Sequence, residues 1–419
     1  MLAAVACTST SSPQRDVGAA SSPAQTADDG AQRDNRAGPP ANGQVLGPTS
    51  LPDGRTTSAY PGQIALLLPL SGRQQAAGVA VRDGFLAAVL AQDAGLRPQV
   101  NIYDSAALGG AAAYARAINE GAQFVVGPLT KEEVQAVADS GSVSVPSLGL
   151  NYLPESALPP GLLFQFALDP EDEARQVARR ALADGRTHGV ALVPDNEWGQ
   201  RLLRAFNAEF AASGGTLVGQ SLYDTSARDY SQPITRLLLI DQSRARANAL
   251  STALGTRFEF EPRSRSDVQF VFIGAQPQQG RSLRPALRFH LSQDLPVYAT
   301  SDVFEPDSDA NADLDGVMFP DMPWIVAPDA TANDLRQSIS SYWPAKSRGR
   351  GRLYAFGFDA FRLIPALRSA RPSDMATDGL TGRLLVDDRG RVRRELSWAQ
   401  VENGRPRTLA INASGPMNP

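Results

Sequence analysis

Cysteine, histidine and lysine are nearly absent from this sequence of 419 residues. It has one cysteine and two histidines, and only Lys131 and Lys346 are lysines, so the other 38 of the 40 basic residues are arginine. One cysteine permits no internal disulfide, and His188 and His290 cannot form a common zinc triad without carboxylates. The scarcity of lysine removes most candidates for a phosphate loop or a Schiff base. We therefore expect no metal site and no cofactor.

Long hydrophobic runs and an excess of positive charge are missing as well. The longest apolar run of the body covers residues 64–70, far short of the ~20 residues that a membrane-spanning helix needs. With 40 basic and 44 acidic residues, the chain has a net charge of -4 and no general field that would hold nucleic acid phosphates. Apolar residues make up 42%, enough for globular cores. A folded chain without a nucleic acid partner is expected.

Catalytic signatures are also lacking. The sequence contains no Gly-x-Ser-x-Gly elbow, no Gly-x-x-x-x-Gly-Lys-Ser/Thr loop and no His-Glu-x-x-His pair. The acidic pair Asp387 and Asp388 stands in a Gly-containing turn between two apolar segments, where it is expected to shape the turn. We do not expect an enzyme.

The single cysteine, Cys7, follows the small residues Ala4 and Ala6, as at the end of a bacterial lipoprotein signal. Residues 1–7 are therefore interpreted as a residual signal with a lipidated Cys7. Only six residues precede Cys7, fewer than a complete signal has. The other interpretation is an incidental cysteine in a disordered start. Thr8 and Ser9 are not acidic, which favours the outer membrane over retention at the inner one.

Residues 8–60 are rich in Ser, Pro, Ala, Gly, Gln and Asp, with almost no large apolar side chains. Such a segment cannot offset its own ordering entropy, so a disordered linker is expected. Its r.m.s. reach as a flexible chain is ~40 Å. The linker would tether the body to the membrane.

Strands and helices alternate from residue 61 onward. Short apolar runs closed by turn residues predict buried parallel strands, and three- and four-residue apolar spacing predicts the helices between them. The predicted elements are strands 64–70, 99–103, 124–126, 143–147, 163–166, 189–193, 216–223, 268–273 and 297–299, and helices 74–92, 111–119, 131–139, 170–183, 196–212, 281–291, 333–342 and 355–369, with a hairpin of 380–386 and 392–401. Asp169, before Pro170, is expected to cap a helix. This pattern predicts an α/β protein with two doubly wound lobes.

Six sequence blocks resemble the LppC/LpoA family, and together they cover roughly residues 61–405. They are Ile-Ala-Leu-Leu-Leu-Pro-Leu-Ser-Gly at 64–72, Asp83-Gly84-Phe85, Val126-Gly127-Pro128-Leu129, Phe-Ala-Leu-Asp-Pro-Glu-Asp-Glu-Ala at 166–174, Tyr-Ala-Phe-Gly-Phe-Asp-Ala at 354–360, and Gly379-Leu380-Thr381-Gly382 leading to Leu396-Ser397-Trp398. Members of this family are outer-membrane lipoproteins that activate a class A penicillin-binding protein, a peptidoglycan synthase.

The resemblance implies a type I periplasmic-binding-protein fold whose chain crosses between two lobes three times. By that fold, lobe 1 would comprise residues 61–167 plus 295–371, and lobe 2 residues 168–294 plus 372–410. It also implies a periplasmic regulator of cell-wall synthesis, anchored by a lipid in the outer membrane. Known members carry a helical-repeat domain before this unit, whereas only the linker precedes it here.

Open α/β sheets bind ligands beyond the carboxyl ends of their strands, so polar residues there are candidates for a cleft. Two alternatives to the regulator stay open: a solute-binding lipoprotein that holds an amino acid or small peptide, and a scaffold that binds peptidoglycan. The same side chains could instead cap helices or pack at the hinge. The cleft candidates are Ser71, Gly72, Thr130, Asn151, Asp195, Asn196, Trp198 and Ser301.

Charge is unevenly spread along the last third of the chain. Residues 302–334 hold nine acidic residues and no basic one, whereas residues 346–407 hold 14 basic and seven acidic residues. Opposed charge can steer a regulator to its partner. Arg348, Arg350 and Arg352, interleaved with glycines, are expected in an exposed loop and are the candidate partner surface.

Overall fold

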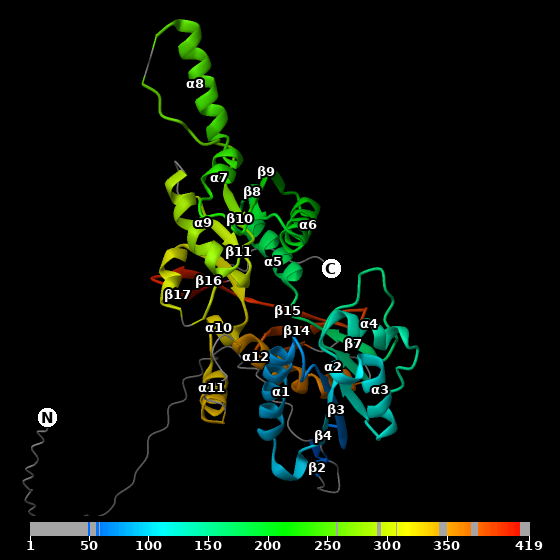
Figure 1. Ribbon diagram of the computed structural model, residues 1–419. Coiled ribbons are helices and arrows are strands. Elements are labelled where there is room, and N and C mark those ends of the chain that lie inside the picture. Colours follow the sequence, from blue (N-terminus) through cyan, green and yellow to red (C-terminus); the bar gives the residue numbers. More distant parts are fainter. Residues whose placement is uncertain are drawn as a thin grey trace, which may run out of the picture. The chain divides into compact units, whose positions relative to one another are not determined.

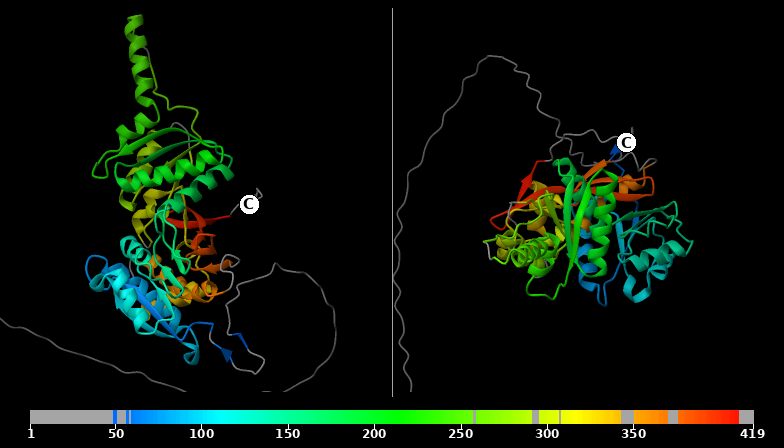
Figure 2. Two further views of the ribbon diagram at one scale, coloured as in Figure 1. Left: turned by 90° about the vertical axis from the view of Figure 1, so that its right-hand side faces the viewer. Right: turned by 90° about the horizontal axis from the view of Figure 1, so that it is seen from above.

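The computed structural model describes residues 49–50, 56–57, 59–256, 259–290, 295–306, 308–342, 350–369 and 376–410. Cys7, Arg348 and most of the predicted linker lie outside these residues. Of the linker, β1 (Thr49–Ser50), β2 (Thr56–Thr57) and residues 59–60 are described. The body contains two mixed sheets with helices on their faces, which confirms the predicted α/β class (Figures 1 and 2).

The first sheet has eight strands in the order β13-β14-β15-β7-β6-β5-β3-β4. Strands β3 to β7 are parallel, and β13 to β15 form an antiparallel extension beside β7. Helices α1 and α12 cover one face, and α3 and α4 cover the other. Its elements are β3 (Gln63–Leu68), α1 (Gln75–Leu90), β4 (Gln99–Asp104), α2 (Ser105–Leu108), α3 (Gly110–Asn119), β5 (Phe124–Val126), α4 (Lys131–Asp139), β6 (Ser147–Gly149), β7 (Leu163–Phe166), α12 (Gly351–Arg362), α13 (Ile364–Leu367), β13 (Ala376–Gly379), β14 (Gly382–Val386) and β15 (Arg391–Glu395).

The second sheet has seven strands in the order β17-β16-β12-β11-β10-β8-β9, of which β16 and β17 are antiparallel additions. Helices α7 and α9 pack on one face, and α5 and α6 pack on the other. Its elements are α5 (Pro170–Ala183), β8 (His188–Pro194), α6 (Glu197–Ala212), β9 (Thr216–Tyr223), α7 (Ser231–Leu237), α8 (Ile240–Leu254), β10 (Phe270–Ile273), α9 (Pro277–His290), β11 (Val297–Ala299), β12 (Val317–Asp321), α10 (Pro323–Val326), β16 (Ser397–Glu402) and β17 (Arg405–Leu409). Helix α11 (Ala330–Tyr342) follows α10, but its buried residues Ala332 and Leu335 pack into the core of the first sheet.

The sheets divide the chain differently from the predicted lobes. Residues 295–371 were expected in lobe 1, but β11 and β12 lie in the second sheet, because β10, α9 and β11 form one more crossover unit of that sheet. Residues 372–410 were expected in lobe 2, but β13 to β15 extend the first sheet. The chain still passes between the sheets three times, after β7, after β12 and after β15.

Two glycines let α1 and α12 approach closely on the first sheet. A Cβ atom on Gly84 would stand 2.0 Å from the Tyr354 carbonyl oxygen, and one on Gly357 would stand 2.0 Å from that of Val81. Since no larger residue fits this contact, the blocks Asp83-Gly84-Phe85 and 354–360 are explained by the packing of one helix against the other.

Asp359 of α12 connects this helix to the turn between β13 and β14. Its buried carboxylate accepts hydrogen bonds from the Leu380 N–H at 3.0 Å, the Thr381 N–H at 2.7 Å and the Thr381 hydroxyl at 2.6 Å. Burial raises the pKa of the Asp359 carboxyl, while these hydrogen bonds oppose the rise. The block Gly379-Leu380-Thr381-Gly382 thus fastens the antiparallel extension to α12.

Replacing Gly84 by alanine should destabilise the protein by ~1–3 kcal/mol, because the methyl group overpacks a backbone contact. The change would be measured as a loss in the free energy of unfolding in urea. Gly95→Ala is the matched control, since a Cβ there meets nothing within 4 Å, and should alter stability by less than ~0.5 kcal/mol. Equal stability of the two variants would contradict the close helix contact.

Candidate functional site

The cleft candidates of the first sheet are bonded within their own turns. The Asp104 carboxylate accepts from the Ser71 hydroxyl and, at 2.9 Å, from the Leu70 N–H. Thr130 caps α4 by accepting the Glu133 N–H at 3.3 Å. Asn151 donates to the Leu129 carbonyl at 3.1 Å, so it lies beside the turn that carries Thr130. Gly72 has a φ of +68° with open space around it.

The candidates of the second sheet are also used locally. Asn196 caps α6 by accepting the Gly199 N–H at 2.9 Å, and Trp198 packs against the core between α5 and α6. Asp195 is exposed and donates its backbone N–H to the Tyr223 carbonyl at 2.8 Å. Apart from Asp195 and Gly72, these polar groups serve turns and caps. Their ligand role remains an untested prediction.

Ser301 belongs to a buried group of charges that the sequence did not predict. Its N–H donates to the Glu173 carboxylate at 2.9 Å, and its carbonyl accepts from Arg352 at 3.0 Å. Glu173 in turn lies 3.5 Å from Arg394. We call the set Glu173, Ser301, Asp302, Asp321, Arg352 and Arg394 the charged joint. It joins α5 and the ends of β11 and β12, in the second sheet, to α12 and β15, in the first.

Arg352 is the strongest link of the charged joint. It donates to Asp321 at 2.6 Å and also to the Phe304 carbonyl at 3.1 Å, and Asp321 is 1% exposed. The prediction that Arg352 lies in an exposed loop is wrong, because the residue stands in the first turn of α12 and points at a buried carboxylate. Arg350 directly precedes α12 and is half-buried. The predicted basic partner surface of Arg348, Arg350 and Arg352 therefore loses Arg352.

Burial dominates the titration of the joint. It raises the pKa of the Glu173 carboxyl to about 7 against the attraction of Arg394, and it also raises the pKa of Asp302. Sequence spacing could not reveal this site, since its members are up to 221 positions apart. The one available signal is the acidic stretch from residue 302, which includes Asp302 and Asp321.

A second set of ion pairs lies around the start of α5. Arg393 contacts Asp172 and Asp387 at 2.9 Å each. Asp387 also accepts the N–H groups of Arg389 and Arg391 at 2.9 Å, which confirms that it shapes its turn. These contacts tie the antiparallel extension of the first sheet to a helix of the second.

Asp169 does not cap α5 with its side chain, contrary to the prediction. Its carboxyl shares a hydrogen bond with Glu171 instead, and burial together with that neighbour raises the pKa of Asp169 to about 8. Glu171 accepts from Arg201 at 2.6 Å. The raised pKa favours a protonated Asp169 beside the Glu171 carboxylate, at the point where the chain first leaves the first sheet.

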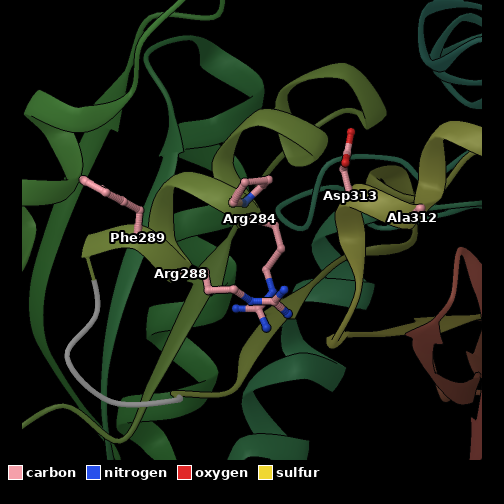
Figure 3. Close-up of a pocket in the computed structure, with 6 residues that line it drawn as sticks. Arg284, Arg288, Phe289, Ala312 and Asp313 are labelled. Atoms are coloured by element: carbon pink, nitrogen blue, oxygen red, sulfur yellow. The ribbon is translucent and has the colours of Figure 1, made fainter.

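A hollow of about 440 Å³ opens beside α9 (Figure 3). Its lining residues are Arg284, Pro285, Arg288, Phe289, Ala312 and Asp313. The guanidinium groups of Arg284 and Arg288 lie together and donate to the Asp315 carbonyl at 2.8 and 3.4 Å, whereas Phe289 points away and is 84% exposed. The hollow brings together no acid–base pair or nucleophile that would suggest catalysis.

Within the described ranges, no group of three or more His, Cys, Asp or Glu residues is arranged to hold a metal ion. No described helix has the length and apolar character to cross a membrane.

Comparison with known proteins gives a consistent family. The LppC putative lipoprotein family matches residues 38–404. Penicillin-binding protein activator LpoA of Photobacterium profundum is 32% identical over 80% of this chain and 55% of its own length, and that of Vibrio cholerae is 29% identical over 81% and 57%. The chain thus spans little more than half the length of these relatives.

Solved structures of the same kind share the fold. The LpoA C-domain of Haemophilus influenzae, a regulator of PBP1A, is 25% identical, with a TM-score of 0.64 over 83% of this chain and 100% of that domain. A putative branched-chain amino acid ABC transporter from Chromobacterium violaceum is 27% identical, with a TM-score of 0.59 over 81% and 100%. A regulator of PBP1A and a putative amino acid ABC transporter protein therefore share this architecture.

Glu173→Gln should change how stability depends on pH. The pKa of Glu173 is about 7 in the folded protein, against 4.5 for an unperturbed glutamate. As the pH rises between these values, the unfolded chain loses its proton before the folded protein does, so the free energy of unfolding falls. The wild type should lose more free energy of unfolding from about pH 5 to about pH 7.5 than Glu173→Gln does, as measured in urea. Glu132→Gln, on the exposed face of α4, should keep the wild-type slope. An unchanged slope in Glu173→Gln would refute the shift.

Proposed function

The chain belongs to the LppC putative lipoprotein family, and from this membership we propose that it binds and activates a class A penicillin-binding protein. The observation that carries the proposal is the full coverage of the Haemophilus influenzae C-domain, a regulator of PBP1A, by the described body of this chain. Relatives named penicillin-binding protein activator match over 80–81% of the chain. The protein would act as a non-enzymatic regulator of peptidoglycan synthesis in the periplasm.

The hydrogen bonds of the cleft candidates support the regulator over the solute binder. A solute site needs polar groups that are free to meet a ligand. Thr130 and Asn196 already cap helices, and Asn151 is bonded to the neighbouring turn. The oxygen atoms that accept these bonds could hold a solute only by giving up contacts that stabilise the fold, although the Thr130 hydroxyl and the Asn196 amide keep their capacity to donate.

Binding to a purified, detergent-solubilised class A penicillin-binding protein tests the proposal. The full chain should bind saturably in surface plasmon resonance and raise the rate of peptidoglycan synthesis several-fold. Absence of both effects would overturn the function. In parallel, an amino acid present at 100 times its dissociation constant would stabilise a solute binder by ~2.7 kcal/mol. We expect no such thermal shift across amino acids and small peptides.

We further propose that a lipid on Cys7 anchors the protein in the outer membrane, with the linker as a tether. The support is the signal-like context of Cys7 and the lipoprotein family. Expressed behind a complete lipoprotein leader, the wild type should fractionate with outer membrane, whereas Cys7→Ser should appear in the soluble periplasm. Thr8→Ser is the control and should stay in the membrane fraction. Membrane retention of Cys7→Ser would count against the anchor.

A further inference from the structure

Helix α8 leaves the second sheet and projects from it (Figures 1 and 2). Only Ile240 and Ser243, in its first turn, are buried. Leu250 and Leu254 are 51% and 62% exposed, although leucines usually lie inside. A helix of this length in water gains most of its stability from packing, so an outer half without a packing surface calls for a partner.

The apolar side chains of α8 follow the spacing of a coiled coil. Ile240, Ala247 and Leu254 follow one another at intervals of seven residues. Ser243 and Leu250, also seven residues apart, lie in the intervals between them. This alternation of three and four residues puts all five on one narrow seam. The seam is half-buried at Ala247 and exposed at Leu250 and Leu254, and the small Ala247 allows another helix to approach closely.

Both arginines of α8 flank this seam. Arg244 and Arg246 occupy the positions beside it at which coiled coils place their charged residues. Arg244 lies 3.8 Å from Asp241, a pair exposed on both sides and therefore weak. In the described part of the chain, no carboxylate lies within ion-pair distance of Arg246. The flanks thus present positive charge with little compensation.

We propose that α8 docks an amphipathic helix whose apolar seam is flanked by carboxylates, and that this helix belongs to the synthase of the proposed function. Charge complementarity selects this occupant. A second copy of α8 would bring only one carboxylate, Asp241, which already lies 3.8 Å from its own Arg244. A membrane surface would require a broad apolar face, whereas this seam offers two leucines and an alanine.

A synthetic helix tests the docking chemistry without the synthase. The probe is a fluorescein-labelled 21-residue peptide with leucine at both seam positions of each heptad and glutamate at both flanking positions. It should bind the full chain in fluorescence anisotropy, with a dissociation constant that rises at least ~10-fold in Arg244→Gln/Arg246→Gln, as expected from two lost charge pairs at an apolar contact. The matched control is Ala245→Glu/Thr252→Glu, which changes the net charge equally on the outward face of α8, at positions not three or four residues from either arginine.

The control pair should bind like the wild type, and circular dichroism should show the same helix content in all three proteins. No binding of the peptide, or equal weakening by the control pair, overturns the proposal. The proposal is also overturned if the wild type sediments with anionic vesicles and does not bind the peptide. It is overturned as well if light scattering shows a dimer that Leu250→Asp dissociates.

The same variants separate this inference from the proposed function. If wild type binds the synthase, Arg244→Gln/Arg246→Gln should slow its association several-fold, since flanking charges chiefly set that rate. Association at the wild-type rate would overturn α8 as the docking site and leave the regulator intact. If wild type binds no synthase, the proposed function fails and the synthase as occupant fails with it, while the peptide still decides whether α8 docks an acidic helix.

Discussion

Buried charge where the two sheets meet is the constraint on which the rest of the body depends. Asp321 is almost completely buried and is compensated by Arg352, while Glu173 is held by Arg394 and the N–H of Ser301. An ion pair of this kind stabilises weakly by itself, but removing one partner leaves an uncompensated charge in a low dielectric. Any movement that separates α12 from β12 would create that state, so the joint resists separation of the sheets.

The sequence blocks that resemble the family lie at close contacts between elements of the body. Gly84 and Gly357 set the approach of α1 to α12, and Asp359 fastens the turn at Leu380 and Thr381. The block at 166–174 carries Glu173 itself. Most of these contacts hold the helices and the antiparallel extension of the first sheet together, and Glu173 alone among these residues belongs to the joint between the sheets.

Local sequence patterns predicted elements well and their assembly less well. The strand at Thr216–Tyr223 and the helix at Lys131–Asp139 have the predicted bounds, because apolar spacing and a Thr130 cap are local signals. The placement of β11 to β15 was wrong, since the choice of sheet depends on which edge a strand meets. The burial of Arg352 was not predicted, because a Gly-Arg-Gly-Arg run indicates a loop. Its partner Asp321 lies 31 positions earlier in the sequence, so no local pattern connects the two residues.

A body held together in this way favours recognition by its surface. Solute binders of two sheets capture their ligand by closing, which requires the contacts at the meeting point to exchange cheaply. In this protein, breaking those contacts would expose Asp321 and Glu173 or leave them buried without a partner. The cleft candidates Thr130 and Asn151 also hold hydrogen bonds of their own. Helix α8 differs from the joint in that its outer half gives up nothing when a partner arrives, since no packing has to break. The buried charges between the sheets therefore fix the scaffold, whereas the outer half of α8 can bind a partner without breaking contacts of the fold.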